Sequence, residues 1–474
     1  MPGGLATGLI TAIGVGWVSP LTGQDRGTLS AVDRYVRDEI RREHVPGVSV
    51  AVVRGGRVVL ARGYGQANVE LRVPATDSTV YQSGSVGKQF TAALILRLAA
   101  AGRLGLDDPI RRHLTEGPPS WDSITVRHLL THTSGIAEYT DSAVDFQRDY
   151  TEDELVRIAA RLPPLFRPGD RWSYSNTGYL LLGAIIHRVT GTFYGDLLRS
   201  EIFAPLGMRT ARIISEADIV PNRAAGYQLA GDTLHNQDWV APSLNTTADG
   251  ALYLTVHDLA RWVIGWDAGR VLGAGDREAA WTPVRLNSGD TYPYGFGWDL
   301  SELRTARRVG HTGAWQGFRT SIQRFPAQDL TVIVLANLAE AHPEAMSLAI
   351  AGLLSPALVP PHRLAGPLPG PRPSVPIQEL LGRLADGRDS ALVTSDLQSF
   401  LGQAERHEWQ ETLGKVTRWT ALGCEPPRDH PITRLGADVA WVCYARAEGP
   451  KNRFAVTAFY TTDWRAVDVE SYSY

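Results

Sequence analysis

A serine and a lysine, Ser85 and Lys88, stand three positions apart at the start of "SVGKQFTAALILRLAAA", a segment that predicts a helix over residues 85–101. Residues i and i+3 share a helix face, so the amine would lie beside the hydroxyl. A serine hydroxyl is a weak nucleophile at neutral pH and needs a base within reach. Lysine can serve as that base if burial lowers its pKa, and the backbone N–H groups of a helix start can hold an oxyanion. The pair therefore indicates nucleophilic hydrolysis, while an exposed lysine beside an N-capping serine is the structural alternative.

Two other motifs are excluded at this position. A phosphate-binding loop needs a glycine five residues before the Gly-Lys pair and a Ser or Thr after it, but Gln82 and Gln89 stand there. The Gly-x-Ser-x-Gly elbow of α/β-hydrolases needs a glycine two residues before the nucleophile, where this chain has Ser83. What remains is an isolated Ser-x-x-Lys pair.

Two further stretches extend this pair. "RWSYSNTGYLLLG" contains Tyr174 and Asn176, and "RRVGHTGAWQGF" contains His311-Thr312-Gly313. In this order the three stretches resemble the signature motifs of the β-lactamase-related, penicillin-recognising serine hydrolases. The resemblance is strongest to the branch of class C β-lactamases, D,D-carboxypeptidases, D-aminopeptidases and esterases. The flanking stretches "ITVRHLLTHTSGI", "FRPGDRWSYSN" and "IFAPLGM" agree, and the resemblance covers roughly residues 30 to 340.

The resemblance implies a role for each motif residue. Ser85 would be the acylated nucleophile, and Lys88 and Tyr174 would share the proton transfer, the phenol being held partly ionised by the lysine charge. Asn176 would bind the substrate amide and orient Lys88. The backbone N–H groups of Ser85 and Ala314 would form the oxyanion hole. No metal or organic cofactor is implied.

The third motif would line the cleft on an edge strand. There His311, Thr312 and Gly313 would meet the leaving group or a terminal carboxylate. β-Lactamases usually have lysine at the position of His311, and an imidazole attracts a carboxylate less than an ammonium does. Ala314 lacks the hydroxyl that carboxylate-binding relatives often carry, and Asp249 stands where relatives tend to have glycine. The first two departures favour a peptidase, amidase or esterase over an efficient β-lactamase.

Each residue also has a structural interpretation. Tyr174 could be a core tyrosine, Asn176 could cap the helix that follows, and His311 could be a turn residue. A second histidine, His132 in "THTSGI", mimics the third motif but follows a helical run rather than preceding a strand pair. We interpret His132 as a structural loop residue.

The elements that must position these residues can be predicted coarsely. Two strands around Gly55-Gly56 predict a hairpin, and "FRTSIQRF" and "LTVIVLANL" predict a strand pair near residue 320. Helices are predicted between them, at "EDELVRIAARL", "NTGYLLLGAIIHRVTG" and "TVHDLARWVIGW". The pattern predicts an α+β fold in which an antiparallel sheet built from both ends of the unit is flanked by helices, with an all-helical subdomain inserted. The site would lie in the crevice between them.

The chain divides into four predicted segments. Residues 1–26 would be a signal peptide or an N-terminal extension, and residues 27–354 the hydrolase domain. A linker with eight prolines follows at 355–376. Residues 377–474 begin helical and end in strands, which predicts a small accessory α+β domain.

Composition narrows the remaining classes. A net charge of -3 gives no basic surface for nucleic acid, and no stretch is long enough to span a membrane. Leu5 to Val18 is uncharged and fits a signal-peptide core, which favours a periplasmic or secreted protein over a cytoplasmic one. Cys424 and Cys443 could form one bridge or remain two buried thiols.

Two functions are therefore carried forward. The first is a serine hydrolase that acts through an acyl-enzyme on amide or ester bonds, in D-amino-acid peptides, small esters or β-lactams. The second is a penicillin-binding sensor that is acylated with little turnover, its C-terminal domain engaging a partner of unknown kind.

Overall fold

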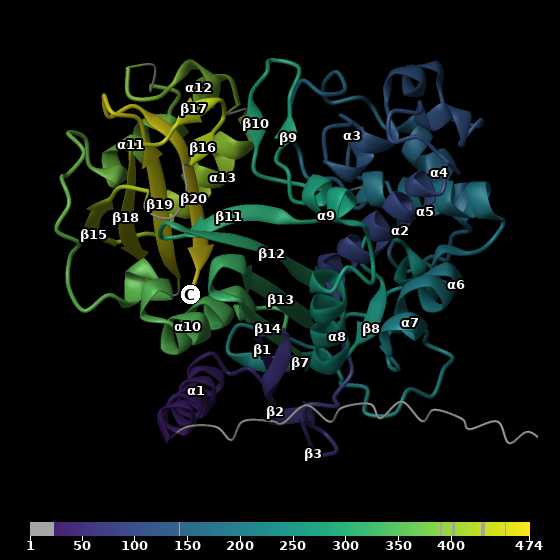
Figure 1. Ribbon diagram of the computed structural model, residues 1–474, viewed down its shortest axis with the longest axis horizontal. Helices are drawn as coiled ribbons and strands as arrows, with labels where there is room; N and C mark the ends of the chain where they lie inside the picture. The colour runs from purple at the N-terminus through teal and green to yellow at the C-terminus, as the bar shows by residue number, and fades with distance from the viewer. Residues whose placement is uncertain (1–22, 142, 389–390, 401–402, 428–431, 451) are drawn as a thin grey trace, which may run out of the picture.

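A seven-stranded antiparallel sheet with the order β11-β12-β13-β14-β1-β2-β3 forms the centre of the molecule (Figure 1). The computed structural model describes residues 23–474 except 142, 389–390, 401–402, 428–431 and 451. The strands of this sheet span Gly47–Arg54 (β1), Arg57–Asn68 (β2), Val73–Pro74 (β3), Asp299–Leu303 (β11), Ala306–Trp315 (β12), Phe318–Phe325 (β13) and Leu330–Ala336 (β14). The prediction that both ends of the unit build one antiparallel sheet is confirmed.

The adjacent strands β1 and β14 are buried along almost their whole length, which explains their continuous apolar sequence. Helices α1 (Gly23–Arg42) and α10 (Pro343–Leu354) cover one face of the sheet, and α8 (Val256–Asp267) covers the other. Gly55 and Gly56 both have positive φ, +60° and +66°, which is the backbone of a tight hairpin turn. The predicted hairpin is therefore present, as β1 and β2.

Most other helices pack together on the α8 side of the sheet and share one hydrophobic core with it. They are α2 (Lys88–Ala100), α3 (Val126–Leu130), α4 (Glu152–Arg161), α5 (Asn176–Thr190), α6 (Tyr194–Leu198), a π-helical turn η4 (Arg199–Phe203), α7 (Ala204–Leu206) and α9 (Ala274–Ala280). In Figure 1 this helical part lies to the right of the sheet. Thr151 and Ser175 cap the starts of α4 and α5 through their side chains.

Short strands and turns connect the two parts. One small sheet has the order β4-β8-β5, from Tyr81–Gln82, Leu252–Leu254 and Arg212–Ile213. Two hairpins are β6 (Tyr227–Ala230) with β7 (Thr233–Asn236), and β9 (Val284–Arg285) with β10 (Thr291–Tyr292). The 3-10 turns are η1 (Gly84–Gly87), η2 (Ile110–Arg112), η3 (Pro119–Ser123), η5 (Pro242–Thr246), η6 (Pro326–Gln328), η7 (Pro356–Leu358) and η8 (Pro361–Arg363).

The C-terminal part has its own hydrophobic core. Helices α11 (Ile377–Ala385), α12 (Ser395–Phe400) and α13 (Gln403–Gly414) precede a four-stranded sheet of β15 (Arg418–Glu425), β18 (Trp441–Glu448), β19 (Arg453–Tyr460) and β20 (Ala466–Ser473). A short pair, β16 (Thr433–Arg434) and β17 (Ala437–Asp438), lies between β15 and β18 in the chain. The C-terminal part therefore begins with helices and ends in strands, as predicted. The boundaries of the four predicted segments stay predictions.

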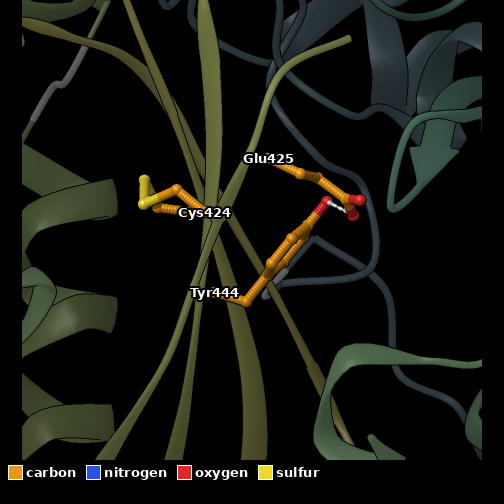
Figure 2. The surroundings of a disulfide bond; sticks show 4 residues. Cys424, Glu425 and Tyr444 are labelled. Carbon is orange, nitrogen blue, oxygen red and sulfur yellow. Dashed lines mark hydrogen bonds between the residues drawn. A yellow bond between two sulfur atoms is a disulfide. The ribbon is translucent and has the colours of Figure 1, made fainter. Parts of the chain in front are cut away.

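Cys424 and Cys443 face each other on β15 and β18 and form a disulfide. Figure 2 shows this bridge on one side of the strands, with Glu425 and Tyr444 pointing to the other side. The Tyr444 hydroxyl donates a hydrogen bond of 3.1 Å to Glu425. Of the two alternatives left open by the sequence, the structure has the bridge.

Two ion pairs join the C-terminal part to β11 and the turn after it. Arg304 donates two hydrogen bonds of 2.7 Å to the carboxylate of Glu425. Arg434, which is 1% exposed, pairs with Glu302 and with Glu470. These pairs hold the C-terminal sheet against the edge of the central sheet (Figure 1).

Within the described residues, no helix is both long enough and apolar enough to cross a membrane. The segment from Leu5 to Val18, predicted as the core of an export signal, lies outside those residues.

Candidate active site

Ser85 and Lys88 lie at the junction of η1 and α2. Most of the predicted helix over 85–101 is present as α2, and the residues before Lys88 belong to the 3-10 turn η1. The Nζ atom of Lys88 lies 3.0 Å from Ser85 Oγ. The predicted contact between amine and hydroxyl is therefore present.

Lys88 is fully buried and its amine has three acceptors. Besides Ser85 Oγ, Nζ donates to Asn176 Oδ1 and to the main-chain oxygen of Asp249, each at 2.7 Å. Burial lowers the pKa of Lys88 to about 8, against the opposing effect of the Asp249 and Glu138 carboxylates. A lysine with this pKa is partly unprotonated near neutral pH and can accept a proton.

Tyr174 lies over the same amine. Lys88 Nζ is 4.8 Å from the centre of the Tyr174 ring and 5.4 Å from that of Tyr179. Burial raises the pKa of Tyr174 well above 10, and the contact with Ser85 lowers it only in part. Burial therefore favours the protonated phenol, whereas the resemblance implies a partly ionised one.

The imidazole ring of His132 packs against the ring of Tyr174. Its ring is 1% exposed and lies 4.4 Å from the Tyr174 ring, centroid to centroid. The backbone N–H of Ser175 donates to His132 Nδ1 at 3.0 Å. Burial lowers the pKa of His132 well below 6.5, so the ring is neutral. His132 lies in the loop after α3, in line with the interpretation from the sequence, and its ring packs against the candidate site.

His311 lies in the interior behind the cleft, in the middle of β12, and is 3% exposed. Its Nδ1 lies 2.6 Å from the Thr312 main-chain oxygen and must donate to it, which leaves Nε2 to accept from the Tyr294 hydroxyl at 3.0 Å. Burial lowers the pKa of His311. The strand β11 pairs with β12 only from Ala306 to Gly310. Residues 311–315 of β12 pair with β13 on one side and with no strand of the described sheet on the other, so the motif lies on a free strand edge, as expected.

Close backbone contacts bring the third motif to the nucleophile. A Cβ atom on Gly313 would lie 2.1 Å from the Ser83 oxygen, and one on Gly84 would lie 2.4 Å from the Ala314 nitrogen. Both positions therefore require glycine. The Thr320 hydroxyl donates to the Ser83 oxygen at 2.6 Å and strengthens this junction. Ala314 N–H is thereby held next to the start of η1.

A cavity of about 310 Å³ opens at this junction. Its lining comprises Gly84, Ser85, Thr140, Tyr174, Asn176, Leu244, Thr247, Asp249, Gly250, Ala251, Ala314 and Trp315. Thr312 lines a different cavity, of about 360 Å³, between β11 and the C-terminal strand β20. Five of the predicted residues lie at this cavity or contact a residue that lines it: Ser85, Lys88, Tyr174, Asn176 and Ala314. His311 and Thr312 are not part of its lining.

Sequence reasoning missed three side chains at the site. Tyr139 donates to the Asp249 carboxylate at 3.0 Å, and Glu138 accepts from the Asn176 backbone N–H at 2.6 Å. Tyr294 orients His311. None of them has a motif of its own, although Asp249 was noticed as unusual. Within the described ranges, no group of three His, Cys, Asp or Glu side chains is placed to hold a metal ion.

The sequence of this chain is similar to a known protein family and to several of its members. The family model described as Beta-lactamase matches residues 32–355. Penicillin-binding protein 4* of Bacillus subtilis (strain 168) is 30% identical over 320 residues, which cover 64% of this chain and 70% of that protein. D-aminopeptidase of Brucella anthropi is 30% identical over 313 residues, 65% of this chain but only 59% of that protein.

One solved structure extends the similarity of fold to the C-terminal part. The octameric penicillin-binding protein homologue from Pyrococcus abyssi aligns over 94% of this chain and 98% of its own, with a TM-score of 0.64 at 23% identity, which shows a shared fold. D-amino acid amidase from Ochrobactrum anthropi SV3, complexed with L-phenylalanine amide, aligns over 65% of this chain and 91% of its own, with a TM-score of 0.59 at 26% identity.

Proposed function

Because the chain belongs to the Beta-lactamase family and is a serine hydrolase of that family, we propose that Ser85 is its nucleophile and Lys88 the base. The observation that carries this proposal is the 3.0 Å contact between Lys88 Nζ and Ser85 Oγ, combined with a lysine pKa of about 8. A buried amine of lowered pKa next to a hydroxyl is the arrangement that activates a serine.

The proposed reaction begins with neutral Lys88. As Ser85 Oγ bonds to the carbonyl carbon, its proton passes to Lys88, and the oxyanion accepts hydrogen bonds from the Ser85 and Ala314 backbone N–H groups. When the C–N or C–O bond breaks, the proton passes through the Tyr174 hydroxyl to the leaving nitrogen or oxygen. A water molecule then attacks the acyl-enzyme, gives a proton to the same base and restores the Ser85 hydroxyl.

Three polar groups would orient this step. Asn176 holds Lys88 through its side-chain oxygen, which leaves its amide nitrogen available for the substrate carbonyl. Tyr174 keeps its proton and can therefore donate to the leaving group. His132 fixes the backbone between these two residues.

The substrates we propose are amides, peptides or esters of D-amino acids. The names of two relatives, a D-aminopeptidase and a D-amino acid amidase, support this class. A carboxypeptidase or an efficient β-lactamase is less favoured, because the neutral, buried His311 brings no positive charge to a substrate carboxylate. Esterase activity on small neutral esters would use the same machinery.

We propose an exported location, periplasmic or secreted. The Cys424–Cys443 disulfide supports it, since disulfides persist in oxidising compartments. The proposed boundaries, with a hydrolase domain at 27–354 and an accessory domain at 377–474, agree with the separate hydrophobic core of the C-terminal part.

Hydrolysis of p-nitrophenyl acetate and trapping of the acyl-enzyme by mass spectrometry test the proposal. Wild type should turn over, and Ser85→Ala should lose both the activity and the acyl adduct, while Ser123→Ala, an exposed serine on η3, should keep both. A long-lived adduct with a fluorescent penicillin and no turnover of any ester or D-amino-acid amide would support the penicillin-binding sensor instead. Full activity in Ser85→Ala would overturn both.

A further inference from the structure

The lining of the active-site cavity carries a single ionisable carboxylate and no cationic side chain. Of the twelve lining residues named above, Asp249 is the one with a carboxylate side chain, and none is Lys, Arg or His. Lys88 lies beneath this surface and is fully buried. The lining therefore offers a substrate one carboxylate and no ammonium, guanidinium or imidazole group.

Asp249 is held close to the nucleophile by its backbone. Its main-chain oxygen accepts from Lys88 Nζ, the same atom that contacts Ser85 Oγ. The next residue, Gly250, packs so tightly that a Cβ atom there would lie 2.5 Å from the Gly84 oxygen. The backbone of Asp249 is therefore fixed beside the reacting atoms.

The Asp249 carboxylate retains hydrogen-bonding capacity. Among the described residues, the Tyr139 hydroxyl is the one donor to this carboxylate, at 3.0 Å. An ionised carboxylate offers about four acceptor sites. Tyr139 is 3% exposed and occupies one acceptor site of the carboxylate. Asp249 lines the cavity, so the remaining lone pairs of its carboxylate are available to a ligand there.

The charge balance at the site changes during the reaction. Lys88 interacts electrostatically with Asp249. Neutral Lys88 is the form that accepts the Ser85 proton, so in the reacting form Lys88 no longer offers a positive charge to Asp249. Glu138, the other nearby carboxylate, already accepts hydrogen bonds from the Asn176 and Thr140 backbones.

From this arrangement we propose that Asp249 forms a subsite for a protonated amine on the acyl part of the substrate, and that it disfavours substrates with a carboxylate near the scissile bond. The subsite rests on the proposed function, and it specifies free α-amino amides and esters over N-blocked or anionic ones. An ammonium bound there would replace the charge that Lys88 loses, and a charge-assisted hydrogen bond of this kind is stronger than a neutral one.

A matched set of p-nitroanilides tests the subsite. D-Alanine p-nitroanilide carries an ammonium, its N-acetyl derivative is neutral, and its N-succinyl derivative is anionic, while the leaving group is the same. In wild type we expect kcat/KM to fall in that order, with about tenfold or more between the first two. In Asp249→Asn both ratios should fall about tenfold, while Asp249→Glu, which keeps the charge, should keep the order.

Two further measurements separate the possible failures. Asp218→Asn removes one negative charge from an exposed side chain outside the cavity lining and should leave the ratios as in wild type. The inhibition constants of D-alanine amide, N-acetyl-D-alanine amide and N-succinyl-D-alanine amide against p-nitrophenyl acetate hydrolysis give the same comparison without anilide turnover. If the ratios of kcat/KM and of the inhibition constants were the same in wild type and in Asp249→Asn, the subsite would be overturned. If the wild-type protein hydrolysed no ester at all, the proposed function itself would be overturned.

Discussion

The imidazole ring of His132 packs against the phenol ring of Tyr174, with 4.4 Å between their centroids. The same imidazole accepts the Ser175 backbone N–H at 3.0 Å. One buried side chain therefore sets both the position of the phenol and the course of the backbone between Tyr174 and Asn176. The second motif is positioned by a residue that lies in a separate stretch of sequence.

Separate variants of His132 should divide these two contributions. His132→Asn can keep an acceptor for Ser175 N–H but loses the ring, and His132→Phe keeps a ring but loses the acceptor. We expect each to lower kcat about tenfold or more through misplacement of Tyr174, with a smaller change in KM. A residue that only stabilised the fold would lower the melting temperature and leave kcat of the folded enzyme as in wild type, so both quantities should be measured.

The pH dependence of ester hydrolysis should report the buried amine. Burial lowers the pKa of Lys88 to about 8, and the reacting form is the unprotonated one. Below that pH, kcat/KM should rise about tenfold per pH unit, and it should level off above it. Asp249→Asn should move the limb to lower pH, because the Asp249 carboxylate raises the pKa of Lys88. If kcat/KM for ester hydrolysis stayed constant from pH 6 to 9, the assignment of Lys88 as the base would be contradicted.

Tyr174→Phe isolates the phenol oxygen. The substitution keeps the ring that packs on His132 and lies over Lys88 but removes the proton donor to the leaving group. We expect kcat to fall about 10²- to 10⁴-fold with the melting temperature close to that of wild type. Substrates with a good leaving group, such as p-nitrophenyl esters, should lose less than alkyl amides, and equal losses would contradict a role in leaving-group protonation.

Much of the site could be predicted from sequence because its chemistry is carried by short motifs. Ser85 and Lys88 are neighbours on one turn, and Asn176 begins a helix whose apolar sequence is plain. The spacing on one turn predicts the contact between Lys88 and Ser85. The contact between Lys88 and Asn176, which are 88 residues apart, was expected from the family resemblance and not from a local pattern. The hairpin of β1 and β2 was predictable from a local pattern, through its two glycines.

Contacts between distant segments could not be predicted in this way. His132 and Ser175 are 43 residues apart, and nothing in "THTSGI" indicates which backbone its imidazole will meet. The short strand β11 has no strong alternation, so its pairing with the first half of β12 was not predicted. The direction in which the pKa of Tyr174 moves could not be inferred from the sequence either, because burial is a property of the whole core.

Removal of the disulfide should weaken the C-terminal part selectively. The bridge joins Cys424 and Cys443 across β15 and β18, with a sequence separation of 19. A cross-link of that loop length contributes about 3 kcal/mol to stability. The double variant Cys424→Ala/Cys443→Ala should therefore lower the calorimetric transition of the C-terminal part, and dithiothreitol should do the same to wild type. An unchanged thermogram in both cases would mean that the thiols are not bridged in solution.

The ion pair between Arg304 and Glu425 predicts how firmly the C-terminal part is attached. Glu425 is 3% exposed in its side chain and Arg304 is 14% exposed, so removing the guanidinium leaves a buried carboxylate with less compensation. We expect Arg304→Gln to destabilise the full chain by about 3 kcal/mol in urea unfolding. Arg465→Ala, which breaks an exposed pair with Asp463 in the same part of the chain, should cost less than about 1 kcal/mol.

In a double-mutant cycle, Glu425→Gln combined with Arg304→Gln should cost less than the sum of the single changes, because the second change removes the uncompensated charge. Strict additivity would show that the two side chains stabilise the chain independently and do not act as a pair.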